Sequence, residues 1–167
     1  MFVTRLITTI AVLLALVVPT TVAFAGTVVR VRGPLSDLQP ATANPTDGAA
    51  ARVRVVEHES STTVALTVVG LDRAFEGTTL GAHVHVGPCI AGSGSSAGAH
   101  YNTGSAASPT TEVWLDFTIR GDGVGSAVAN VPFVIPEGDA ASIVIHALAT
   151  DHTGGAGMRL ACIGVPL

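Results

Sequence analysis

Two histidines separated by one residue give the first sign of chemistry in this sequence. His83 and His85 lie in the run GAHVHV, where valine alternates with histidine. Side chains two residues apart on a β-strand point to the same face, so both imidazoles would project together while Val84 points the other way. Two nitrogen donors on one face suit a metal ion. Two solvated or hydrogen-bonded histidines on a polar face are the alternative.

The remaining histidines are less informative when each is taken alone. His146 interrupts the apolar run SIVIHAL, where a single histidine is more often a hydrogen-bonded core or edge residue than a ligand. His100 follows a glycine-rich segment and indicates little by itself. We expect His58 and His152 to be solvated, although His152 lies in the segment that leads to Arg159 and could act as an outer group or a fifth ligand.

A site that combined four of these histidines would favour particular metals. His83, His85, His100 and His146 offer four imidazole nitrogens and no thiolate. This donor set suits Cu(II) in a tetragonal site better than calcium or magnesium, which prefer oxygen, and zinc remains possible on ligand type alone. The sequence has no Cys-x-x-Cys pair, no His-Glu-x-x-His motif and no Gly-x-Ser-x-Gly elbow, so zinc-finger, metalloprotease and hydrolase functions have no support.

Short β-branched and alternating runs, separated by Gly, Pro, Asp and Asn, must position these side chains. The pattern predicts eight strands and no helix, at residues 27–32, 51–57, 63–69, 81–86, 112–119, 125–131, 142–148 and 159–165. Two segments rich in Gly and Ser, 87–110 and 150–157, have too few apolar residues to form elements and are expected to be loops. The sequence therefore predicts one all-β domain over residues 26–167.

The first 25 residues are interpreted as a secretory signal peptide. Arg5 precedes an apolar stretch from Leu6 to Pro19, and Ala23-Phe24-Ala25 fits the small-x-small cleavage pattern. We therefore expect cleavage after Ala25 and a secreted mature chain without stable membrane insertion. A retained membrane anchor is the alternative, but the apolar stretch is shorter than the roughly 18 residues that a span needs.

Two cysteines and one arginine relate to the histidine pair. A secreted chain with only Cys89 and Cys162 is expected to join them in a disulfide. Cys89 follows His85 by four residues and Cys162 follows Arg159 by three, so the disulfide would bring Arg159 towards the histidines. A permanent cation beside a metal suits the binding of a small anion. A surface charge at a strand end is the alternative.

Acidic residues outnumber basic ones along the chain. Eight arginines and no lysine stand against twelve acidic residues, and from residue 26 onward the net charge is −5. Without a basic excess to displace phosphate counterions, a nucleic-acid partner is not expected. Chemistry that depends on lysine is excluded.

In order along the chain, five segments resemble the copper/zinc superoxide dismutase family. They are GAHVH at 81–85, Cys89, AGAHYN at 97–102, VIH at 144–146 and GMRLAC at 157–162. The resemblance implies an eight-stranded Greek-key β-barrel that holds copper at its outside through His83, His85, His100 and His146. It also implies that Cys89 and Cys162 form the family disulfide and that Arg159 draws superoxide to the metal.

The sequence departs from the family at the zinc site. His100 matches the family's bridging histidine, but residues 101–111 contain no histidine, and the later zinc histidine falls near Glu112. Asp116 could replace the zinc aspartate, yet zinc normally requires four ligands. We predict copper without structural zinc, as in copper-only relatives of the family.

The resemblance implies a secreted enzyme that converts superoxide to oxygen and hydrogen peroxide. His100 would either accept a proton during turnover or remain a simple ligand. The net charge opposes an anionic substrate at long range, so attraction would come locally from the metal and Arg159. A copper-binding or structural barrel without efficient turnover is the alternative, favoured by the short stretch between His146 and Arg159. The family contains monomers and dimers, so the resemblance implies neither state.

Overall fold

The computed structural model describes residues 26–104 and 106–167. The predicted signal peptide and its cleavage site fall on residues 1–25, outside the described residues. Within the described part of the chain, no helix is long and apolar enough to cross a membrane.

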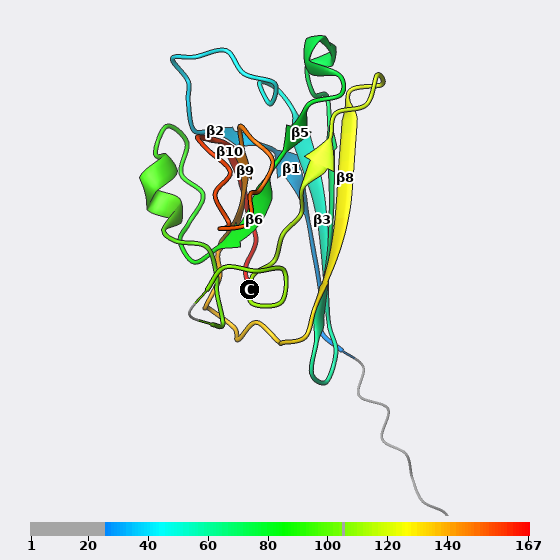
Figure 1. Ribbon diagram of the computed structural model, residues 1–167, viewed down its shortest axis with the longest axis vertical. Coiled ribbons are helices and arrows are strands. Elements are labelled where there is room, and N and C mark those ends of the chain that lie inside the picture. Colours follow the sequence, from blue (N-terminus) through cyan, green and yellow to red (C-terminus); the bar gives the residue numbers. More distant parts are fainter. Residues whose placement is uncertain (1–25, 105) are drawn as a thin grey trace, which may run out of the picture.

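Two four-stranded antiparallel sheets form the two layers of the molecule (Figure 1). The first sheet has the order β1 (Val28–Pro34), β3 (Ala50–Glu57), β4 (Thr62–Val69) and β8 (Val124–Val131). The second has the order β2 (Ser36–Asp37), β10 (Arg159–Gly164), β9 (Ser142–His146) and β6 (Ala82–His85). The short strands β5 (Thr79–Leu80) and β7 (Phe117–Thr118) pair with each other, and two 3₁₀ helices are present, η1 (Arg73–Phe75) and η2 (Gly94–Ala97).

Alternating residues give the first sheet one buried face and one wet face. In β3, Val53 and Val55 are buried, whereas Arg52 and Arg54 between them are exposed. Side chains with a period of two lie on opposite faces of a sheet, so the register is fixed by the need to bury the valines. The arginines therefore point away from the other layer.

The same alternation places the histidines on the outer face of the second sheet. Val84 and Ile145 belong to the main core between the sheets, so their neighbours His83, His85 and His146 point to the opposite side. A smaller apolar cluster of Leu38, Ala97, Val144 and Cys162 lies apart from the main core. The histidines thus lie on the outer face of the second sheet, where Gly98 at the end of η2 contacts His85 and the loop after β9 contacts His83 and His146.

The segment 112–119 differs most from the sequence prediction. Only Phe117–Thr118 forms a strand, while Glu112 and Trp114 make isolated bridges. The alternation itself is used, because Val113 and Leu115 are fully buried. The pairing partner changes along the segment, from Asn102 to His83 and then to β5, so no continuous ladder forms.

The other predicted strands agree with the structure to within a few residues at each end. The strands β2 and β5 are absent from the sequence prediction, because two residues are too few to show a period. The prediction that 87–110 forms no element is wrong, since η2 lies within it, closed by bonds from Ser96 N–H to Ser93 O and from Gly98 N–H to Ser95 O. The segment 150–157 is a loop, as predicted.

Candidate metal centre

Four histidines from separate parts of the chain meet at one place. One potential ligand atom from each of His83, His85, His100 and His146 lies within 4.8 Å of the others. His83 and His85 come from β6, His146 from the end of β9, and His100 from a residue bridged to His85. His83 and His85 are fully buried, His146 is nearly so, and His100 is half-buried.

Hydrogen bonds fix the tautomer of three of these rings. The Nδ1–H of His85 donates to the Gly98 carbonyl, that of His146 to the Gly157 carbonyl, both at 3.2 Å, and that of His100 to Glu112 Oε2 at 2.9 Å. Carbonyls and carboxylates only accept hydrogen bonds, so Nδ1 must carry the proton in each ring. The Nε2 lone pairs of these three histidines are therefore free to bind a metal.

His83 differs from the other three histidines because its Nε2, rather than its Nδ1, is hydrogen-bonded to the protein, through Thr150 and Asp116. The hydroxyl of Thr150 donates to Asp116 Oδ1 at 2.6 Å, and the same oxygen lies 2.7 Å from His83 Nε2. A hydroxyl has a single proton, so here it accepts from the Nε2–H of His83. Asp116 Oδ2 also accepts from the Thr150 backbone N–H at 2.7 Å, which holds this threonine in place. Nδ1 of His83 is left with the lone pair.

Two features of the histidine cluster indicate that it could hold a cation. His83 Nδ1 is the buried side-chain atom without a hydrogen-bond partner among the described residues. Nε2 of His85 lies 3.3 Å from Nε2 of His146. Neither nitrogen carries a proton, because the single proton of each neutral ring is on Nδ1 and is donated to a carbonyl. Buried acceptors normally have donors, so facing lone pairs of this kind are best satisfied by a metal ion, and the residues present fit one.

Burial keeps these histidines in the neutral form that binds metals. Desolvation, followed by repulsion from the neighbouring histidines, lowers the pKa of His83 to about 2. Desolvation, His100 and then Arg159 lower the pKa of His85 to about 3. Desolvation is also the main cause that lowers the pKa of His146, to about 4. Neutral imidazole is the ligand form, so the site is ready for a metal at neutral pH.

Glu112 holds the fourth histidine. Its Oε2 accepts from His100 Nδ1 at 2.9 Å and from Trp114 Nε1 at 2.8 Å, and its Oε1 accepts from Asn102 Nδ2 at 2.9 Å. The side chain is nearly buried. A buried carboxylate needs such partners to offset its desolvation, and here they place its charge directly behind the His100 ring.

Arg159 is attached to the same framework through two carbonyls. Its Nη1 donates to Gly94 O and its Nη2 to Gly98 O, both at 2.6 Å. The Gly98 carbonyl therefore serves both Arg159 and His85. Gly98 has φ of +68°, and a Cβ there would lie 2.8 Å from Val86 Cγ2, so a larger residue would disturb this shared acceptor.

The disulfide predicted from the cysteine count is confirmed. Cys89 and Cys162 are joined, with their Cα atoms 5.6 Å apart. The bond fastens the segment that carries Gly94 and Gly98 to β10, which begins at Arg159. It thereby positions the carbonyls that orient Arg159 and His85.

The structure places His83, His85, His100 and His146 in one cluster, and the Gly98 carbonyl joins Arg159 to His85. His58 and His152 are exposed and lie outside the cluster, and His58 Nε2 contacts Thr63 Oγ1 at 3.3 Å. Of the two acids considered for zinc, Glu112 contacts His100 and Asp116 contacts Thr150.

Several residues that orient the four histidines were not predicted from the sequence. Trp114 shares the alternation of Glu112 and Asp116, so this period could have placed all three on the metal side of the chain. Thr150 carried no signal, because its role depends on how the loop 147–158 folds over β6. Gly98 was visible only as one of many glycines.

Comparisons with known proteins give a likeness in structure. No protein-family model matches the chain, and no curated protein matches it in sequence. Among solved structures it is similar to a double mutant of a SOD-like protein from Bacillus subtilis, in which a tyrosine and a proline are each replaced by histidine. The TM-score is 0.60 at 21% identity, and the match covers 81% of this chain and 96% of that chain.

At 21% sequence identity, the likeness to this structure supports the fold alone. It agrees with the antiparallel two-layer arrangement and with the all-β fold that the sequence predicted. The chain therefore has a fold of the copper/zinc superoxide dismutase type, with a buried cluster of four histidines that could hold a metal ion.

Proposed function

We propose that this chain is a secreted, copper-dependent superoxide dismutase that works without structural zinc. The observation that carries the proposal is that one possible ligand nitrogen from each of four histidines lies within 4.8 Å of the others, with one ring nitrogen of each histidine held by a protein acceptor. An all-nitrogen donor set of this kind favours copper. A copper ion bound there would supply reversible one-electron exchange with superoxide.

The protein's own groups would orient the ligands and attract the substrate. Thr150 and the carbonyls of Gly98 and Gly157 hold three rings in the ligand tautomer. The Arg159 cation lies close enough to lower the pKa values of both His85 and His146. A positive charge at that distance favours a small anion beside the metal, where the net charge of the whole chain opposes it.

His100 is the ligand best placed to hold a proton at Nε2 when that nitrogen is free. It is the most exposed of the four, and its Nδ1–H already points at the Glu112 carboxylate. The Glu112 carboxylate accepts the hydrogen bond of His100 Nδ1–H at 2.9 Å, so Nε2 is the ring nitrogen left to exchange a proton with a bound species. His100 could thus deliver a proton to reduced superoxide.

The proposed absence of structural zinc is supported by the contacts of Glu112. Where the resemblance places a zinc ligand, this carboxylate is occupied by His100, Trp114 and Asn102. It supplies the charge and the hydrogen bond that hold His100 without a second metal.

An Arg159→Ala variant tests the catalytic proposal. The rate of superoxide decay with copper-loaded protein should fall, and its decrease with rising ionic strength should flatten, because the local cation has been removed. Arg120→Ala, which removes an exposed charge paired with Asp122, is the matched control and should leave both unchanged.

Zinc titration tests the metal assignment. The copper-loaded protein should show the same decay rate before and after zinc is added, and it should bind one copper per chain. A rate that rises with a second, stoichiometric zinc would overturn the zinc-free proposal. Tight copper binding with no superoxide decay above that of a His83→Ala/His85→Ala variant would favour a copper-binding module instead.

A further inference from the structure

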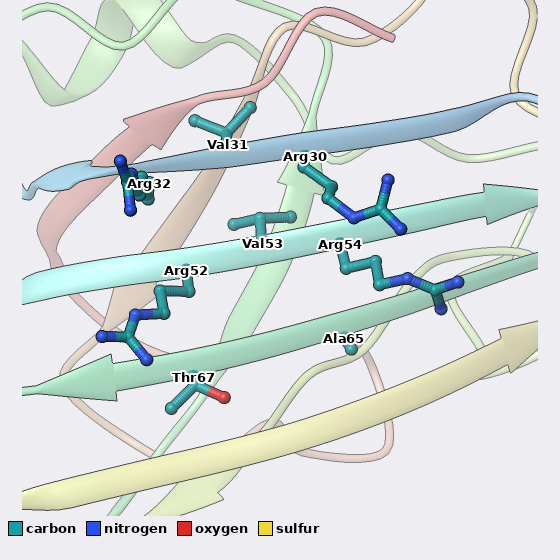
Figure 2. A pocket seen from close by; sticks show the side chains of 8 residues that line it. All are labelled: Arg30, Val31, Arg32, Arg52, Val53, Arg54, Ala65 and Thr67. Atoms are coloured by element: carbon teal, nitrogen blue, oxygen red, sulfur yellow. The ribbon is translucent and has the colours of Figure 1, made fainter.

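Four arginines lie together on the outer face of the first sheet (Figure 2). We call Arg30, Arg32, Arg52 and Arg54 the arginine patch. Arg30 is directly opposite Arg54 across β1 and β3, and Arg32 is opposite Arg52. All four side chains are exposed, while the valines between them face the core.

This arrangement places like charges against each other without any neutralising partner. Like charges directly opposite on neighbouring strands destabilise a sheet. Among the described residues the ion pairs are His100 with Glu112 and Arg120 with Asp122, so none involves the arginine patch. The outward positions on the adjoining strands β4 and β8 are uncharged, for example Thr67, Ser126 and Val128.

Charge is segregated on this molecule. From residue 26 onward, the chain outside the arginine patch has three arginines and twelve acidic residues. A net charge of −9 on the rest of the chain thus coexists with +4 on one sheet face. A face that concentrates cations while the rest is acidic attracts anions locally and orients them.

The patch is also hollowed. Ala65 is opposite Arg54, and Thr67 is opposite Arg52, across β3 and β4. These small side chains leave a depression of about 450 Å³, lined by the four arginines together with Ala65 and Thr67. Figure 2 shows the guanidinium groups extending along and over the strands around this depression.

The spacing and chemistry of the patch suit a chain of phosphates. Paired residues on neighbouring strands are about 5 Å apart, and residues two apart on one strand are about 7 Å apart. Guanidinium groups bind phosphate oxygens in pairs through a planar fork. Two rows of such forks match a linear polyanion with closely repeated charges better than a single small anion.

The face lacks the groups that other anionic partners would use. β1, β3, β4 and β8 contain no aromatic residue. Single-stranded nucleic acids are usually held by stacking of bases on aromatic rings, and membrane-surface proteins commonly insert aromatic residues at the interface. Neither feature is present on these four strands.

We propose that the arginine patch binds a linear phosphate polymer, with the phosphates lying across the paired arginines. The binding site is independent of the metal centre, because the histidines and the arginines point away from the core on opposite outer faces of the two layers. Bound polymer therefore leaves the metal centre open.

Binding of inorganic polyphosphate to the chain from Gly26 onward, measured by titration calorimetry, tests this inference. The double variant Arg30→Gln/Arg54→Gln removes one cross-strand pair, and Arg73→Gln/Arg120→Gln removes the same charge elsewhere. We expect the patch variant to weaken binding about tenfold or more and to lower the salt slope by about 1 for each arginine. The control should change affinity by less than about twofold, apart from the general charge effect.

Several outcomes would overturn the proposal. Equal weakening in both double variants would mean that net charge alone binds the polymer. Binding to anionic phosphatidylglycerol vesicles without binding to polyphosphate would make the face a membrane surface instead. No binding of polyphosphate to the wild-type protein at low salt would remove the site. Removing like-charge pairs should not unfold the sheet, and an unchanged melting temperature checks that the patch variant is folded.

Discussion

At the candidate metal centre, each of the four histidines is held through one ring nitrogen by an acceptor of the protein. Three rings donate from Nδ1 and one from Nε2, and the difference arises from Thr150, whose hydroxyl accepts from His83 and donates to Asp116. Residues behind the ligands are thus as important to the site as the ligands, because they set which lone pair faces inward.

Replacement of Thr150 by valine should damage the site at nearly constant volume. Valine lacks the hydroxyl that accepts from His83 Nε2–H and donates to Asp116 Oδ1. Because these groups are partly buried, losing the hydroxyl should lower the free energy of unfolding by about 1–3 kcal/mol. Copper affinity should fall about 10- to 100-fold, measured by competition with a chelator of known affinity. Thr42→Val, at an exposed position, should change neither quantity, and equal copper affinity in the two variants would contradict this role for Thr150.

Glu112→Gln tests the carboxylate that holds His100. A glutamine cannot accept from His100, Trp114 and Asn102 at once, because one of its two terminal groups is a donor. We expect weaker copper binding and slower superoxide decay, with a smaller stability loss than for an alanine substitution. Glu59→Gln at an exposed position is the control. If the zinc-free Glu112→Gln variant kept the full decay rate, the charge of Glu112 would be irrelevant to catalysis.

The spacing predicted that His83 and His85 share a face, and the resemblance to the copper/zinc superoxide dismutase family added His100 and His146, but neither predicted the groups behind these rings. His83 and His85 follow directly from the period of a strand. Thr150 and Gly98 could not be predicted in the same way, because their contacts depend on loop paths that no local pattern encodes.

Among the elements, the segment between β6 and β7 contributes most to the site. It has η2 as its only helix among the described residues, and it is fastened to β10 by the disulfide and by the bonds of Arg159 to Gly94 and Gly98. Within η2, Ala97 is the buried member. The disulfide and these two hydrogen bonds therefore hold the segment against β10.

Loss of the disulfide should affect both stability and metal binding. The two cysteines are 73 residues apart, and the loop-closure model gives about 4 kcal/mol for a loop of this size. A Cys89→Ala/Cys162→Ala variant should therefore unfold at lower denaturant concentration and bind copper more weakly. If copper affinity matched that of the wild type while stability fell, the disulfide would support the fold alone.

The buried histidines predict a pH dependence for the metal-free protein. Their pKa values lie below the ordinary 6.5 in the folded chain, at about 2 for His83, 3 for His85 and 4 for His146. Below pH 6.5 these histidines take up protons in the unfolded chain but stay neutral in the folded chain. Their contribution to the free energy of unfolding is therefore fully present above pH 6.5 and is lost as the pH falls towards 4.

The slope should reach about 1.4 kcal/mol per pH unit for each such histidine. Thermal melts of the metal-free protein between about pH 7 and pH 4.5 measure it. A triple variant with His83, His85 and His146 each replaced by glutamine should show a flatter dependence. Equal slopes would mean that the histidines already protonate in the folded chain.

The strands show where local pattern predicts elements and where it does not. Long alternating runs such as Arg52–Val55 are predicted correctly, because burial of one face fixes them. The segment 112–119 has the same alternation but changes partner twice, and a continuous ladder depends on the partner as well as on the segment.

In the molecule as a whole, the histidine cluster and the arginine patch lie on different sheets. The second sheet bears the histidines on its covered outer face, and the first sheet bears the arginine patch on its open outer face. The overall class and the positions of most strands along the chain could be predicted, because the alternating apolar runs of residues 26–167 suit a two-layer β fold. The pairing of non-neighbouring strands such as β1 with β3 came from the structure.

The rate of superoxide decay with copper-loaded residues 26–167 is the decisive measurement of the proposed activity. It should be compared with a His83→Ala/His85→Ala variant loaded in the same way, with the disulfide intact and zinc withheld. We expect a second-order rate approaching the diffusional range of about 10⁸–10⁹ M⁻¹s⁻¹ that is lost in the variant. A rate no higher than that of the variant, despite stoichiometric copper in the wild type, would contradict it.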